Sequence, residues 1–114
     1  MKAAASVSTD IHVVMGVSAS GKSTVGRLLA QARGATYLDG DDFHPPENVA
    51  RMATGQALTD ADRQGWLSAL RARLAQARTA REGVVLSCSA LKRRYRDLLR
   101  QGAPDLQLVV LHGS

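Results

Sequence analysis

The sequence has little cysteine, few aromatic residues and no long apolar run. Its single cysteine, Cys88, excludes an intrachain disulfide and a zinc site built from several cysteines. One tryptophan, two tyrosines and one phenylalanine are too few and too scattered for a surface that stacks bases. No apolar run approaches the roughly 20 residues of a membrane-spanning helix, and residues 1–10 lack the apolar stretch of a secretory signal. We therefore expect a cytoplasmic protein that does not contact a membrane.

The composition is that of one small globular domain. The chain has 114 residues, of which 45% are hydrophobic and 22% charged. We expect residues 1–10 to form a flexible tail and residues 11–114 to form the domain. The three histidines, His12, His44 and His112, show no metal-ligand spacing. The formal net charge of +5 fits either nucleic acid or a pocket for anionic small molecules.

Short apolar runs alternate with segments of helical period. The runs at 11–15, 35–39, 83–88 and 106–111 predict buried strands. Helices are predicted from about 21 to 33, from about 60 to 81, and from about 91 to a stop at Gly102 and Pro104. Thr59 and Asp62 resemble a capping box, and Gly34 suits a left-handed helix end. This order predicts right-handed crossovers and an open α/β sheet whose ligands bind at the carboxyl ends of the strands. The predicted apolar helix stripes are Val25, Leu28, Leu29 and Ala32; Leu67, Leu70, Leu74 and Ala77, beside Trp66; and Leu91, Tyr95, Leu98 and Leu99.

A phosphate-binding loop follows the first predicted strand. Residues 16–23 fit the pattern G-x-x-x-x-G-K-[ST] in full and lie between a predicted strand and a predicted helix. Glycine lets backbone N–H groups converge on a phosphate chain, and the helix N-terminus adds further donors. Lys22 should reach the β- and γ-phosphates of a nucleotide, and the Ser23 hydroxyl should bind Mg²⁺. The motif alone leaves open a small-molecule kinase, an NTPase switch or a motor. The expected nucleotide contacts are Gly16, Val17, Ser18, Ala19, Ser20, Gly21, Lys22, Ser23 and Thr24.

An acidic turn, residues 39–44, follows the second predicted strand. In an extended backbone Asp39 and Asp41 would point the same way. Transfer of a phosphoryl group to an alcohol needs the hydroxyl oriented, its proton accepted and Mg²⁺ held. We assign Asp39 to the Mg²⁺ shell and Asp41 to the acceptor hydroxyl, as catalytic base or orienter together with Lys22. A solvated turn with an Asp cap is an equal alternative, and His44 is either a substrate contact or a turn residue ordered by Pro45 and Pro46.

Four segments together resemble a known family. They are the phosphate loop, DGDDFHPPEN, RMATGQALTDADRQGWL and CSALKRRYRDLLR. In this order they resemble gluconokinase, in the shikimate-kinase-like branch of P-loop kinases, from Ile11 to Ser114. The resemblance implies a three-layer P-loop NTP hydrolase-like fold with a mostly parallel sheet. It also implies transfer of phosphate from ATP to D-gluconate with Mg²⁺, and it matches Asp39 and Asp41 to the family's paired aspartates.

A polyol carboxylate needs cationic and hydrogen-bonding partners. Arg63 is the first candidate for gripping the carboxylate, because Asp62-Arg63 matches the family segment near the acceptor pocket. Ser89 could donate to a phosphate or a gluconate hydroxyl. Lys92 and Arg96 share a helix face and could form the basic wall of the acceptor site. The alternatives are an exposed Arg63 paired with an acid and a solvated basic helix face. Thr59 and Asp60 are interpreted as helix caps, Cys88 as a small buried residue and Trp66 as core.

The pattern departs from the family at its end. Relatives continue into a lid with arginines, a fifth strand and terminal helices, whereas this sequence stops at Ser114. We therefore expect a fold that lacks the usual lid and last strand, with the fourth strand as an apolar edge. The alternatives are a kinase of another hydroxy acid such as shikimate, and a non-catalytic nucleotide-binding module that acts through a partner or as a homodimer. The basic run from Lys92 to Arg96 leaves nucleic-acid binding as a minor third hypothesis.

Overall fold

The computed structural model describes residues 9–16, 21–89 and 92–111, so most of the expected tail lies outside the described residues. Strands and helices alternate along the chain, as the sequence predicts. The elements are β1 (Ile11–Gly16), α1 (Lys22–Arg33), β2 (Thr36–Asp39), the 3₁₀ helix η3 (Gly40–Phe43), α2 (Pro46–Ala53), α3 (Asp60–Ala80), β3 (Val84–Ser89), α4 (Arg93–Gly102) and β4 (Gln107–Val110). No described helix combines the length and the apolar content needed to cross a membrane.

The four described strands form one parallel sheet in the order β2-β3-β1-β4. β1 lies inside the sheet, where Gly16 pairs with Ser89 of β3 and Met15 pairs with Val110 of β4. Asp39, the last residue of β2, pairs with Ser87. The carboxyl ends of β1, β2 and β3 therefore meet at one edge of the sheet. The expectation of an α/β fold with a parallel sheet is confirmed.

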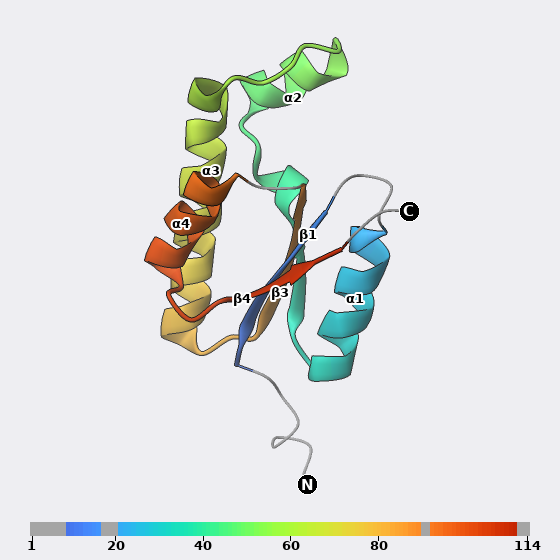
Figure 1. Ribbon diagram of the computed structural model, residues 1–114, viewed down its shortest axis with the longest axis vertical. Coiled ribbons are helices and arrows are strands. Elements are labelled where there is room, and N and C mark those ends of the chain that lie inside the picture. Colours follow the sequence, from blue (N-terminus) through green and yellow to red (C-terminus); the bar gives the residue numbers. More distant parts are fainter. Residues whose placement is uncertain (1–8, 17–20, 90–91, 112–114) are drawn as a thin grey trace, which may run out of the picture.

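One face of the sheet is covered by α3 and α4 and the other by α1, which gives three layers (Figure 1). The α3 and α4 side holds the larger core. The predicted stripe of α3 is buried throughout, and Trp66, Tyr95 and Leu99 join it, while Leu98 is partly buried and Leu91 lies outside the described residues. Burial of these large side chains makes this layer the main source of stability.

The α1 layer packs mainly through small residues, and of the predicted stripe only Leu29 packs against the core there. Gly26 and Ala30 face the sheet, whereas Val25 and Leu28 are 37% and 61% exposed. A Cβ atom on Gly26 would lie 2.8 Å from Cε1 of Tyr37. Because Gly26 allows this close approach, the helix turns its glycine–alanine face inward with Leu29 beside it, and Val25 and Leu28 face outward.

Helix ends follow the local signals. Thr59 accepts a hydrogen bond from the backbone N–H of Asp62 through Oγ1 at 3.1 Å, and Oδ2 of Asp62 accepts the N–H of Thr59 at 2.9 Å. This is the predicted capping box at the start of α3. Gly34 ends α1 with a φ of 64°, in the expected left-handed conformation. Both helix ends therefore form at the residues that the sequence predicts for them.

The segment after β2 contains two elements that the sequence does not predict. Residues expected as a turn form η3 and then α2, which begins at Pro46. Proline suits the first helical position, where its missing N–H costs nothing. At the opposite side of the sheet, β4 is the edge strand and Val110 is 46% exposed, as expected of an apolar edge.

Candidate active site

The nucleotide side of the site begins where β1 ends. Gly16 closes the strand, and Gly21 precedes α1 with a φ of 78° and a ψ of 24°. This left-handed conformation favours glycine, which explains why the pattern requires it at this position. Lys22 and Ser23 occupy the first turn of α1 and are half-buried, while Thr24 is exposed. The remaining predicted contacts, Val17, Ser18, Ala19 and Ser20, lie outside the described residues.

The first turn of α1 is free of acidic residues, and no described side chain caps it. The first N–H groups of a helix have no partner within the helix, and they add to the positive end of the helix dipole. At this position both features favour an anion, and the positive charge of Lys22 adds to them. This end of α1 can therefore bind phosphate.

The phosphate-loop lysine and the acidic turn share one neighbourhood. Burial and, to a smaller extent, the charges of Asp41 and Asp39 raise the pKa of the Cys88 thiol to about 12, while the charge of Lys22 acts to lower it. All three charges therefore act on one thiol, which is 1% exposed at the carboxyl end of β3. Cys88 is the small buried residue that was expected, and around it the structure brings together the predicted nucleotide and acceptor groups.

The Asp39 and Asp41 pair is held by a turn. The expectation of an extended backbone is wrong, because the chain enters η3 directly after Asp39. Oδ1 of Asp39 accepts the backbone N–H of Asp41 at 3.0 Å. Asp39 thus caps η3, as the alternative interpretation proposed, and orients the residue that carries the second carboxylate.

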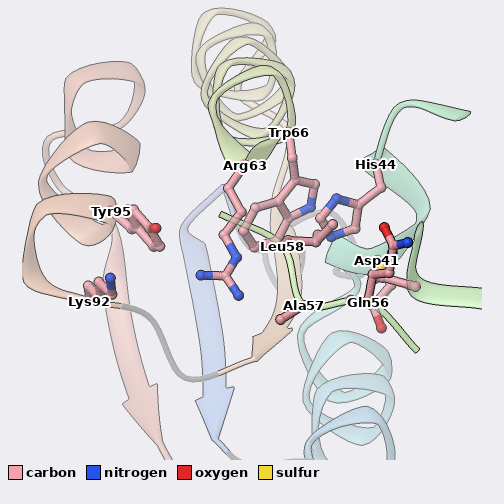
Figure 2. Close-up of a pocket in the computed structure, with 10 residues that line it drawn as sticks. Asp41, His44, Gln56, Ala57, Leu58, Arg63, Trp66, Lys92 and Tyr95 are labelled. Carbon is pink, nitrogen blue, oxygen red and sulfur yellow. The ribbon is translucent and has the colours of Figure 1, made fainter. Parts of the chain in front are cut away.

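A cavity of about 320 Å³ opens beside this turn (Figure 2). Four of the predicted acceptor residues line it, from η3, α3 and the start of α4. Its volume lies in the range of roughly 300–1,000 Å³ that is usual for small-molecule sites. The lining residues are Asp41, His44, Met52, Gln56, Ala57, Leu58, Arg63, Trp66, Lys92 and Tyr95.

Arg63 is the cation best placed to bind a ligand. Its guanidinium makes no hydrogen bond or ion pair with the described residues, although the side chain is half-buried. Figure 2 shows it extending from α3 into the cavity, between Lys92 and Asp41 in that view. Five fixed donors on an unpaired, partly desolvated guanidinium suit a carboxylate.

Lys92 also lines the cavity, but its ammonium group forms an ion pair with Asp60. Nζ of Lys92 lies 3.2 Å from Oδ1 of Asp60, and Arg94 and Tyr95 donate to the same carboxylate. The interpretation of Asp60 as a helix cap is therefore incorrect, because its side chain crosses from α3 to α4. The hydrogen bonds from Tyr95 and Lys92 lower the pKa of Asp60 to about 2. This cluster fixes the start of α4 beside the cavity.

His44 and Trp66 form a stacked wall of the cavity. Their ring centroids are 4.5 Å apart and their planes differ by 11°. Nε1 of Trp66 donates to the carbonyl oxygen of Gly40 at 2.7 Å. Trp66 is core, as expected, and it also anchors the 3₁₀ helix that carries Asp41. Burial lowers the pKa of His44, so its ring is neutral near neutral pH.

Two predicted acceptor residues are not among the cavity lining. Arg96 is half-buried on α4, and its Nε is buried without a hydrogen-bond partner among the described residues. Ser89 pairs with Gly16 through the backbone, and its side chain is not described. A substrate role for either residue stays a prediction.

Several residues that line the cavity were not predicted from the sequence. Gln56, Ala57 and Leu58 come from the loop between α2 and α3, and Met52 comes from α2 itself. This loop lies within a segment that carries the family resemblance, RMATGQALTDADRQGWL, but the resemblance gave these residues no role. Pro45 and Pro46 at the start of α2 were the available signal, because proline at the first position of a segment favours a helix start.

The architecture defines a P-loop-type α/β domain, since a glycine-rich loop joins a central parallel strand to its helix, with an acidic turn and a cationic cavity at the same edge. A family model described as an AAA domain matches residues 11–112, and the chain belongs to that family.

Known relatives resemble the chain along most of its length. It is 49% identical over 105 residues to the thermoresistant gluconokinase of Escherichia coli K12, covering 91% of this chain and 59% of that protein. It is 50% identical over 100 residues to a gluconokinase of Gluconobacter oxydans, covering 88% and 55%. The crystal structure of a gluconokinase from Sinorhizobium meliloti 1021 matches with a TM-score of 0.84 and 54% identity, covering 95% and 60%. The chain spans about three fifths of the length of these relatives.

Proposed function

We propose that this protein transfers the γ-phosphoryl group of ATP to D-gluconate, giving 6-phospho-D-gluconate and ADP. The observation that carries the proposal is the cavity with an unpaired Arg63 and an exposed Asp41, beside the N-terminus of α1. The resemblance to gluconokinases at about half identity supports gluconate as the acceptor. The cytoplasm is the compartment that we propose for this reaction.

ATP would lie with its phosphates over the start of α1. Lys22 would reach the β- and γ-phosphates, and the loop that begins at Gly16 would supply backbone N–H groups. The uncapped first turn of α1 supports this placement, because its donors and dipole favour the triphosphate. These contacts hold the γ-phosphate toward the acidic turn.

The residues present fit a magnesium ion. Mg²⁺ prefers oxygen ligands and keeps several waters when it binds with a nucleotide. The Ser23 hydroxyl and the Asp39 carboxylate offer such oxygens. Of the two carboxylate oxygens of Asp39, Oδ1 accepts a hydrogen bond from the described residues and Oδ2 does not. A dedicated protein cage is not required, and the described residues contain no cluster of three or more ligating side chains. When bound, Mg²⁺ would neutralise charge on the phosphates.

Gluconate would enter the cavity with its carboxylate toward Arg63 and Lys92. A bidentate bond to Arg63 fixes that end, and Asp41 faces a hydroxyl near the γ-phosphate. The hydroxyl oxygen forms a bond to phosphorus while the bond from phosphorus to the β,γ-bridging oxygen breaks. ADP leaves with that electron pair, and Asp41 accepts the hydroxyl proton.

A panel of acceptors tests the proposal. ADP release from ATP is measured with D-gluconate, with shikimate, with other hydroxy acids and without any acceptor. We expect gluconate to give the highest kcat/KM, since the relatives that match at half identity are named gluconokinases. A higher kcat/KM with shikimate, or ADP release that does not depend on any acceptor, would overturn the proposal.

A further inference from the structure

A buried asparagine connects the cavity to the start of α3. Asn48 lies on α2 and is 2% exposed, the only buried residue of that helix. Its Nδ2 lies 2.7 Å from the backbone carbonyl oxygen of Asp62 and 3.2 Å from Nδ1 of His44. None of the motifs in the sequence assigns a role to this residue.

These two contacts fix the orientation of the amide. A carbonyl oxygen only accepts hydrogen bonds, so the atom of Asn48 that faces Asp62 must be the NH₂ group. The same nitrogen then offers its second hydrogen to Nδ1 of His44. Nδ1 therefore accepts, and the proton of the neutral ring lies on Nε2.

The other ring nitrogen is available to a ligand. Nε2 of His44 has no hydrogen-bond partner among the described residues, and it is not among their buried unpaired atoms. The ring lines the cavity and is held flat against Trp66. The charged groups that face the ring are Asp41 from η3 and Arg63 from α3, and Lys92 lines the same cavity from α4.

We propose that Asn48 is a positioning residue, which fixes His44 as an Nε2–H donor toward the acceptor cavity. Its effect on gluconate rests on the proposed function, whereas its effect on the ring does not. A donor at this point suits a hydroxyl oxygen of a polyol, which can accept from Nε2–H and donate to a carboxylate such as Asp41. Asn48 thereby tunes which acceptors the cavity selects.

The first test needs no substrate. Long-range ¹H–¹⁵N correlation spectra of the full chain report which ring nitrogen carries the proton, and His44→Gln identifies the signals of His44 among the three histidines. We expect the Nε2–H tautomer in the wild type. In Asn48→Asp the new carboxylate accepts from Nδ1–H, so the neutral ring should change to the Nδ1–H tautomer. A wild-type ring with the proton on Nδ1, or one that averages both tautomers, would overturn the inference.

The second test uses D-gluconate and ATP. At a pH where His44 is neutral, Asn48→Asp should raise KM for gluconate about tenfold, the loss of one good hydrogen bond, with KM for ATP unchanged. At lower pH the imidazolium again carries Nε2–H, and KM should return toward the wild-type value. Because the aspartate also raises the pKa of His44, this recovery should begin at a higher pH than the pH at which the wild-type ring takes up a proton.

The two tests separate the two claims. If the wild type does not phosphorylate gluconate, the proposed function fails while the tautomer measurement still decides the role of Asn48. If gluconate is phosphorylated and KM does not follow the tautomer, the positioning role is wrong. Asn48→Ala, which removes both hydrogen bonds, should leave the ring averaging between tautomers and serves where the aspartate variant does not fold.

Discussion

The nucleotide side and the acceptor side of this site are built differently. In the proposed complex the nucleotide side relies mainly on backbone N–H groups, from the segment between Gly16 and Gly21 and from the uncapped first turn of α1, to which Lys22 and Ser23 add their side chains. The acceptor side is made of side chains that come from η3, α2, α3, α4 and the loop before α3. A backbone site needs a few residue types at fixed spacing, whereas a side-chain site depends on which elements the fold brings together. The first can be found in a sequence, and the second is found in a structure.

The largest expected effect is on the acceptor side. Asp41→Ala should lower kcat by about 10²–10⁴, the range for loss of a general base, with little change in ATP affinity. The matched control is Asp42→Ala, because Asp42 is the next residue of η3, is exposed and does not line the cavity. Steady-state kinetics and calorimetric titration with ATP measure the two quantities. Equal losses of kcat in both variants would mean that catalysis needs only the negative charge of the turn and not the Asp41 carboxylate itself.

On the nucleotide side, Lys22→Ala should lower kcat by about 10²–10³. Removal of one hydrogen-bond donor that stabilises the transition state has an effect of this size in other enzymes. ATP binding should weaken as well, while gluconate binding is retained. Gln31→Ala, an exposed residue of the same helix, is the control for folding. If Lys22→Ala changed gluconate affinity as strongly as ATP affinity, the division of the site into two sides would be wrong.

A smaller effect is expected at the carboxylate end of the acceptor. Arg63→Ala should raise KM for gluconate by about 10–100-fold, since a hydrogen bond to a charged group contributes about 1.5–3 kcal/mol. KM for ATP should not change. Arg71→Ala is the matched control, because Arg71 lies on the same helix and bonds to Gln101 instead of lining the cavity. An unchanged KM for gluconate in Arg63→Ala would remove this residue from the acceptor site.

These differences also explain how far the sequence could predict the structure. The sheet, the three long helices and the phosphate loop follow from periodicity and glycine spacing. Helix α2 was missed because it buries no apolar stripe, and its Val49 and Met52 are 51% and 42% exposed. Asp60 was interpreted as a cap because its partners, Arg94 and Tyr95, arrive from a helix far along the chain.

The acceptor site was predicted in part for the same reason. His44, Arg63 and Lys92 were named from local patterns and a family resemblance, and the fold brings them to one cavity with Asp41. The stack of His44 on Trp66 depends on the angle between η3 and α3, which no local pattern encodes. The predicted stripe of α1 was wrong at Val25 and Leu28, because a single glycine decided which face of the helix could approach Tyr37.

The smallest expected effect concerns Asp60 and the pH dependence of stability. Its pKa is lowered from 3.8 to about 2 in the folded protein, so its contribution is complete above pH 3.8 and is lost as the pH falls toward 2. Urea unfolding of Asp60→Asn and wild type should therefore differ at neutral pH and converge as the pH falls. Asp97→Asn, on the exposed surface of α4, is the control. If the difference in unfolding free energy between wild type and Asp60→Asn stayed constant down to pH 2, the lowered pKa of Asp60 would be contradicted.

The central claim is that a phosphate held by the backbone loop is passed to an alcohol held by the side-chain cavity. Phosphorus-31 NMR of the protein with ATP, Mg²⁺ and D-gluconate tests it most directly. We expect ADP and a new phosphate monoester to grow in equal amounts, and both to form about 10²–10³ times more slowly with Lys22→Ala. Growth of inorganic phosphate without the ester, or bound ATP that stays unchanged in the presence of gluconate, would contradict the account.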